Sequence, residues 1–188
     1  MSPIARLRGV VLERGPGWLI VEVGGLGLQV YASAAALSGA REGETVELHT
    51  HLVVRDESWA LYGFPTREEL ELFRSLIGVG GVGPRLALAL LSALGAPALS
   101  DAIARGDADA LARTPGVGRK LAGRIVLELR GRLAAEAATP PEQREVLEAL
   151  LALGYSREEA REALRLADLP PDAPLEEKLR AVLRRLAR

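Results

Sequence analysis

The segment GVGPRLA at residues 81–87 recurs at residues 116–122 as GVGRKLA. In each copy two glycines flank a valine, and a basic residue and a Leu-Ala pair follow. Glycine suits a tight turn because it adopts conformations closed to other residues and lets another molecule approach the backbone. One copy alone would be explained as well by a helix end and a turn, since short motifs often occur by chance. Two copies in the same order predict a tandem helix–hairpin–helix.

Each predicted hairpin offers a site for a phosphate group. The valine between the glycines can plug into the core, which leaves the amides that open the next helix facing outward. Such amides bind anions, helped by the helix dipole, and contacts of this kind carry little base-sequence information. The DNA-binding residues predicted here are Gly81, Val82, Gly83, Arg85, Gly116, Val117, Gly118, Arg119, Lys120 and Arg124.

Basic charge gathers in the same region. The net charge of the 188 residues is −1. Residues 64–133 carry ten basic and seven acidic residues, against five and seven in residues 1–63 and nine and eleven in residues 134–188. A local basic surplus is what nucleic-acid binding requires, and whole-chain basicity is not.

Residues 1–63 show strand patterns. Residues 18–23 form a β-rich run, and apolar residues alternate along 26–30, 46–54 and 59–61. Residues 33–37 fit a short helix. About five strands with one short helix predict a small β-barrel, with the OB-fold as the obvious candidate.

The remaining chain is predicted to be helical, which gives an α+β fold overall. Thr66 with Glu69 forms a capping box that opens a helix ending at Ile77, and residues 64–133 hold both hairpins. The sequence AAEAATPP at residues 134–141 reads as a linker. Residues 142–188 predict a three-helix bundle, in which Gly154 ends the first helix and Ser156 caps the second.

Several function classes are excluded by composition. There is no cysteine, so neither a thiolate metal site nor a disulfide framework can form. The two histidines, His49 and His51, are too few for an ordinary zinc site, and we expect them at the surface or at a subunit contact. No phosphate loop of the G-x-x-x-x-G-K-[ST] kind is present, and no apolar run reaches the ~20 residues of a membrane helix. We expect a cytoplasmic protein without a cofactor, a metal or an activity of its own.

An ordered series of segments, read together with the hairpins, resembles a known family. The series comprises RLRG at residues 6–9, THLVVRDE at 50–57, LYGF at 61–64, the two hairpins, and ALLALGY at 149–155. Over essentially its whole length the chain resembles the RuvA family of Holliday junction branch-migration subunits.

The resemblance implies a partner set and further sites. RuvA proteins are tetramers, alone or as two tetramers face to face, that hold four-way junction DNA open and present it to the hexameric ATPase RuvB, with the RuvC resolvase as a further partner. Asp56 and Glu57 would form an acidic pin at the centre that rejects continuous duplex, and Arg55 would contact a nearby phosphate. Leu150, Leu153 and Tyr155 would dock the motor, although they could equally form the bundle's own core.

Two rival functions remain open at the level of sequence. A helix–hairpin–helix DNA glycosylase would place a catalytic acid after the second hairpin or carry iron–sulfur cysteines, and neither is present. A general duplex or single-strand DNA-binding protein is the alternative. Trp18 and Trp59 could stack on bases, but packing in the core or at an interface is the use we favour.

Overall fold

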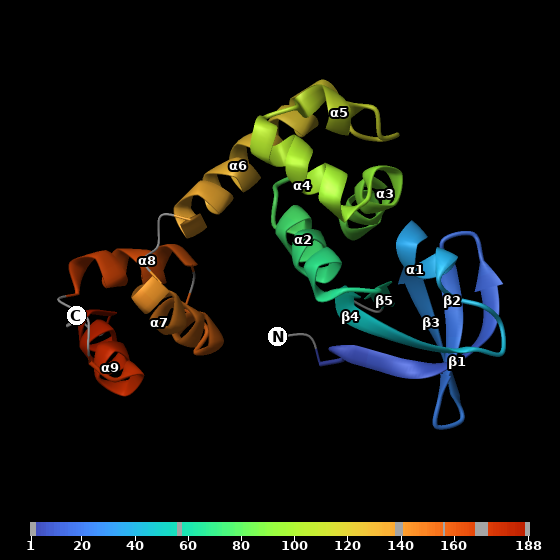
Figure 1. Ribbon diagram of the computed structural model, residues 1–188, viewed down its shortest axis with the longest axis horizontal. Coiled ribbons are helices and arrows are strands. Elements are labelled where there is room, and N and C mark those ends of the chain that lie inside the picture. The colour runs from blue at the N-terminus through green and yellow to red at the C-terminus, as the bar shows by residue number, and fades with distance from the viewer. Residues whose placement is uncertain (1–2, 56–57, 138–140, 156, 168–172, 187–188) are drawn as a thin grey trace. The chain divides into compact units, whose positions relative to one another are not determined.

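The computed structural model describes residues 3–55, 58–137, 141–155, 157–167 and 173–186 (Figure 1). Contacts along the chain divide it into two units, Met1–Arg132 and Leu133–Arg188. Each unit is described by itself.

The first unit begins with a closed five-stranded barrel (Figure 1). Its strands run in the order β1-β2-β3-β5-β4, and all neighbours are antiparallel except β3 and β5. This arrangement confirms the predicted OB-fold barrel. The strands are β1 (Arg6–Gly15), β2 (Trp18–Val23), β3 (Leu26–Ala32), β4 (Thr45–Arg55) and β5 (Ser58–Phe64).

Strand β1 was not predicted individually, and its geometry explains why. The pairing of β1 with β2 shifts register between Val11 and Glu13. Such a bulge adds a residue to one strand and breaks the alternation that identifies a strand in sequence. Leu7 and Val11 of β1 are nevertheless buried in the barrel core, beside Leu19 and Val21 of β2.

Five helices complete the first unit. The predicted cap at Thr66 is confirmed, because its side chain accepts a 3.2 Å hydrogen bond from the Glu69 amide at the start of α2. Within the described ranges no single helix is long and apolar enough to cross a membrane, and the pair α3 and α4, bent by 98°, meets that test only jointly. The helices are α2 (Arg67–Ile77), α3 (Pro84–Leu94), α4 (Ala96–Arg105), α5 (Ala108–Ala112) and α6 (Arg119–Ala137).

A buried joint connects the barrel to these helices. Ser33 caps the short helix α1 (Ala34–Ser38), as predicted, and its hydroxyl also donates a 2.7 Å hydrogen bond to the Glu69 carboxylate of α2. The ring of Phe73 from α2 lies 5.1 Å from Tyr62 and 4.8 Å from Phe64, both on β5. These side chains belong to the same core cluster as the hairpin valines, so the barrel and the helices share one apolar interior.

The second unit is a three-helix bundle, as predicted, built from α7 (Pro141–Ala152), α8 (Arg157–Leu166) and α9 (Leu175–Leu186). Its core includes Val146, Leu150 and Val182. Gly154 follows α7 with a φ of 95°, which fits its predicted role as a helix stop. The predicted cap residue Ser156 lies outside the described residues.

The linker predicted at residues 134–141 is wrong in extent. Helix α6 continues through Ala137, and Pro141 already opens α7. Alanine and glutamate in the AAEA run are strong helix formers, and proline is favoured in the first turn of a helix. Only residues 138–140 lie between the two helices, and they fall outside the described ranges.

Candidate nucleic-acid interface

The two hairpins have the same backbone structure. Residues 78–83 and 113–118 make matching turns, which lead into α3 at Pro84 and into α6 at Arg119. In one, the amide of Val82 donates to the carbonyl of Val79, and in the other, the amide of Val117 donates to the carbonyl of Thr114, both at 3.0 Å. The duplicated sequence therefore folds into a duplicated local structure, as predicted.

The valines anchor the hairpins in the core. Val82 is 5% exposed and Val117 is 4% exposed, and both belong to the helical core cluster. Burying such side chains stabilises the fold by roughly 1.5–3 kcal/mol each. The flanking glycines are thereby held at the surface, which confirms the predicted plug.

The first glycine of each hairpin is required by the fold itself. Gly81 has a φ of 92° and Gly116 a φ of 87°, a region that costs other residues roughly 1–2 kcal/mol. A Cβ on Gly81 would lie 3.4 Å from Cδ1 of Leu121, and one on Gly116 would lie 3.2 Å from Cδ1 of Leu86. Each hairpin thus packs on the helix that follows the other hairpin, so the two form one unit.

The second glycine of each hairpin has no such internal reason. Gly83 has a φ of −82°, and Gly118 is not among the glycines with positive φ. A Cβ added to either would meet nothing within 4 Å. Since the described chain tolerates a side chain at both positions, the glycines leave the backbone open to a partner outside the chain.

Amide donors and basic side chains gather at these open positions. No side chain caps Gly83, and the first-turn amides of Arg85, Arg119 and Lys120 have no carbonyl one turn earlier in their helices. The side chains of these three residues are exposed, and none of the ion pairs found among the described residues involves them. The arrangement can bind anionic oxygens through amides and cations together.

Arg124 is placed differently from the other predicted DNA contacts. It lies one turn into α6, with an exposed side chain, and its Nη1 donates a 3.1 Å hydrogen bond to the carbonyl of Gly80 in the first hairpin. The guanidinium therefore ties the second motif to the first, a role that the sequence did not suggest.

The predicted acidic pin lies outside the described residues, because Asp56 and Glu57 are not described. Arg55 is the last residue of β4 and pairs in register with Ser58 of β5, while its side chain is not described. The structure therefore places the neighbouring strand ends and leaves the pin as an expectation.

The predicted docking residues do not share one surface. Leu150 is fully buried in the bundle core, which excludes direct contact with a partner and corrects that assignment. Tyr155 is half-buried against the same core. Leu153 is 59% exposed and stays available.

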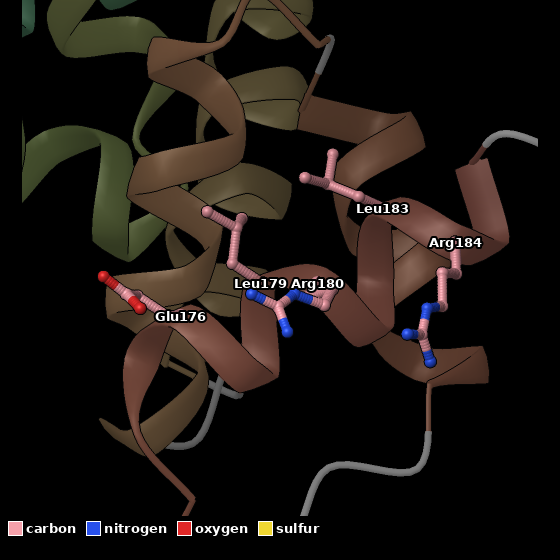
Figure 2. Close-up of a pocket in the computed structure, with 5 residues that line it drawn as sticks. All are labelled: Glu176, Leu179, Arg180, Leu183 and Arg184. Carbon is pink, nitrogen blue, oxygen red and sulfur yellow. The ribbon is translucent and has the colours of Figure 1, made fainter.

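An open groove along α9 was not predicted. Figure 2 shows its lining side chains along one helix, with Glu176 at one end and Arg184 at the other. Its volume is about 460 Å³. The available signal was the leucine stripe of α9, interleaved with basic residues, which we assigned to the bundle core alone. The lining residues are Glu176, Leu179, Arg180, Leu183 and Arg184.

The surface position expected for His51 is wrong. Its ring lies 5.8 Å from Phe73 of α2, edge to face, and its buried Nδ1 has no hydrogen-bond partner among the described residues. Burial, and then the positive charge of Arg74, lower the pKa of His51. The side chain is part of the contact between barrel and helices.

Comparison with known proteins covers both units. Residues 4–63 match the RuvA N terminal domain, residues 73–131 the SAM-like Helix-hairpin-helix tandem, and residues 141–187 the RuvA, C-terminal domain. The chain is 49% identical to the Holliday junction branch migration complex subunit RuvA of Chloroflexus aggregans, over 96% of this chain and 97% of the relative. It is 46% identical to the proteins of that name from Rubrobacter xylanophilus, over 97% of both chains, and Thermomicrobium roseum, over 98% of both. This chain therefore belongs to the RuvA family.

Proposed function

We propose that this chain binds four-way Holliday junction DNA through its paired hairpins and serves as the non-catalytic DNA-binding subunit of a branch-migration complex. The printed name of its relatives, Holliday junction branch migration complex subunit, supports the junction as substrate. The observation that carries the proposal is the pair of open glycines, Gly83 and Gly118, at equivalent positions beside exposed basic residues.

The hairpins account for affinity, and assembly accounts for specificity. Each hairpin offers contacts to phosphates, which carry little information about sequence or branching. A homotetramer would place hairpin pairs on all four arms, so a four-way junction would satisfy sites that a linear duplex leaves empty. The acidic pair at Asp56 and Glu57 would act at the centre, because each carboxylate near a phosphate costs about 1 kcal/mol at ~4 Å in water.

The C-terminal bundle is the part we assign to docking of the RuvB ATPase. The bundle carries Leu153 exposed at the end of α7 and a separate open groove on α9. The groove combines leucines with guanidinium groups, which suits an apolar partner surface with an acidic rim. Leu150 lies in the core and contributes only through stability.

Competition binding tests the proposed function. The labelled four-way junction is held at a constant concentration while unlabelled junction or linear duplex of the same sequence is added to the full-length chain. We expect the junction to compete far better than the duplex, and equal competition would favour a general duplex-binding protein. Native mass measurement of the same complexes checks for four subunits, and stimulation of RuvB ATPase activity on the junction checks docking, with Leu153→Ala expected to weaken that stimulation without altering DNA affinity.

A further inference from the structure

The β4–β5 hairpin extends beyond the rest of the barrel. Strand β4 pairs with β1 only from Thr45 to His49, and β5 pairs with β3 only from Leu61 to Gly63. The pairing of β4 with β5 continues as far as Arg55 and Ser58. Its last rungs therefore form a two-stranded ribbon with no third strand among the described residues.

This ribbon carries an exposed apolar pair. Val54 is directly opposite Trp59 in the register; Val54 is 55% exposed and Trp59 is 75% exposed. Side chains two residues apart share a strand face, so the pair continues the face on which Leu52 and Leu61 contact the barrel core. That face leaves the barrel with its apolar character intact.

Trp59 stands apart from the other aromatic residues. Tyr31, Tyr62, Phe64 and Phe73 contact one another or the core, and Trp18 is only partly exposed. Of the described aromatic side chains, Trp59 alone is classed as exposed. Core packing, the use favoured from the sequence, is therefore wrong for Trp59, and the exposed indole needs another explanation.

The size of the pair limits what can cover it. A tryptophan buries at most about 250 Å², whereas a stable protein interface buries about 800 Å² on each partner. A second copy of the chain would need much more surface than this ribbon offers. A single planar ring matches the indole well, since stacking on an aromatic side chain works for every base.

Charge in the neighbouring sequence selects the same kind of ligand. Asp56 and Glu57 follow the Val54 strand directly and precede Trp59 by only two residues. Carboxylates repel phosphates, so the part of a DNA strand that approaches here most easily is an uncharged base. In a continuous duplex both faces of each base are already stacked, and only a strand opened at a branch presents a free face.

We propose that Trp59, supported by Val54, is a stacking site for an unpaired DNA base at the crossover of a branched substrate. This inference rests on the proposed junction binding and adds a base-binding site to it. It predicts that the chain recognises opened DNA by stacking as well as by phosphate contacts.

Intrinsic fluorescence tests the site directly, because the sequence contains only two tryptophans. The Trp18→Phe variant leaves Trp59 as the sole emitter, and the Trp59→Phe variant leaves Trp18. Each full-length variant is titrated with a four-way junction and with linear duplex of the same sequence. We expect the junction to quench the Trp59 emission and the duplex to leave it unchanged, while the Trp18 emission responds to neither.

Affinity measurements complete the test. We expect Trp59→Ala to weaken junction binding roughly tenfold, within the range of base–aromatic stacking, with duplex affinity unchanged. Trp59→Phe should restore most of the loss and Trp59→Leu should not, because only the former keeps a ring. Leu26→Ala, at another exposed apolar side chain of the barrel, is the matched control and should leave junction affinity unchanged.

The outcomes separate the two proposals. Junction binding with unchanged Trp59 emission would overturn the stacking site and leave junction binding standing. A Trp59 emission that shifts with protein concentration in the absence of DNA would assign the indole to a contact between copies and would likewise overturn it. Absence of junction binding by the unmodified chain would instead overturn the proposed function.

Discussion

Arg124 of helix α6 donates a 3.1 Å hydrogen bond to the backbone carbonyl of Gly80 in the first hairpin. The bond crosses between the two motifs, alongside the reciprocal contacts of Gly81 with Leu121 and of Gly116 with Leu86. The spacing of the two hairpins is therefore set by side chains as well as by the intervening helices. This separates residues that position the hairpins from residues that are free to bind DNA.

Arg124→Ala and Arg119→Ala test that separation. Arg124→Ala removes an internal hydrogen bond from a charged donor, so we expect the free energy of unfolding to fall by about 1 kcal/mol. Arg119 is exposed in the first turn of the same helix, and its replacement should leave stability unchanged. In salt titrations of junction binding, Arg119→Ala should reduce the slope of log affinity against log salt by about 0.9, the value for one phosphate contact. A reduced slope together with unchanged stability in Arg124→Ala would show that Arg124 is a phosphate ligand instead.

The two glycines of the second hairpin should respond differently to the same substitution. Gly116→Val places a branched side chain at a φ of 87° and against Leu86, so we expect a loss of stability of roughly 1–2 kcal/mol or more. Gly118→Val meets open space and should change stability by less than about 0.5 kcal/mol. Its effect should be on DNA, because the side chain would hold the phosphate away from the amides. Thermal unfolding and junction titration of both variants check this, and a Gly118→Val protein with full affinity would remove the open-glycine argument.

Local signals in the sequence were sufficient for much of this interface. Tight turns and caps depend on residues near one another in the chain, so the hairpins, the Thr66 cap and the short helix after Ser33 could be predicted. Arg124 could not be assigned correctly, because its partner at Gly80 is set by packing between motifs. The same limit applies to Trp59 and Leu150, whose sequence contexts are both apolar although one side chain is exposed and the other buried.

Regular patterns failed where the backbone departs from them. The bulge in β1 broke the alternation of that strand, and the small residues after α6 extended the helix although the double proline suggested a linker. His51 was placed on the surface because only its strand face could be read, and the helix that covers this face comes from later in the chain.

Stability should depend on pH through His51. Its pKa in the folded protein is lowered from the ordinary value of 6.5, so the unfolded chain binds the proton more tightly than the folded one. The contribution is therefore complete above pH 6.5 and is lost as the pH falls toward the lowered folded value. We expect the free energy of unfolding of the unmodified chain to fall between about pH 7 and pH 5 more steeply than that of His51→Phe. Parallel pH profiles for the two proteins would contradict this.

Reversing the acidic pair tests the proposed pin. We expect replacement of Asp56 and Glu57 by lysine to strengthen linear-duplex binding severalfold, because a repulsion of about 1 kcal/mol per charge pair becomes an attraction. Glu176→Lys with Glu177→Lys makes the same change in net charge on exposed positions of α9 and serves as the control. Equal gains in the two double variants would mean that net charge alone is responsible, and the pin would lose its support.

Thr114 shows where the second hairpin departs from the first. It accepts through its carbonyl from the amide of Val117, as Val79 accepts from the amide of Val82, so the two residues occupy equivalent positions. Thr114 is 3% exposed, and its hydroxyl oxygen has no hydrogen-bond partner among the described residues. A buried polar group without a partner costs about 1–3 kcal/mol, a cost that valine at the first hairpin does not carry.

Thr114→Val should therefore stabilise the protein. The substitution keeps the branched shape, removes the unsatisfied hydroxyl and copies the residue of the first hairpin, so we expect the free energy of unfolding to rise by about 1 kcal/mol. Val79→Thr is the mirror variant and should lower it by a similar amount, because Val79 is also buried, at 2% exposed. Chemical denaturation of both variants measures the changes, and junction affinity should stay constant since neither side chain reaches the surface. Destabilisation by Thr114→Val would show that the hydroxyl has a partner in solution, such as a bound water molecule, and that the two hairpins are not interchangeable at this position.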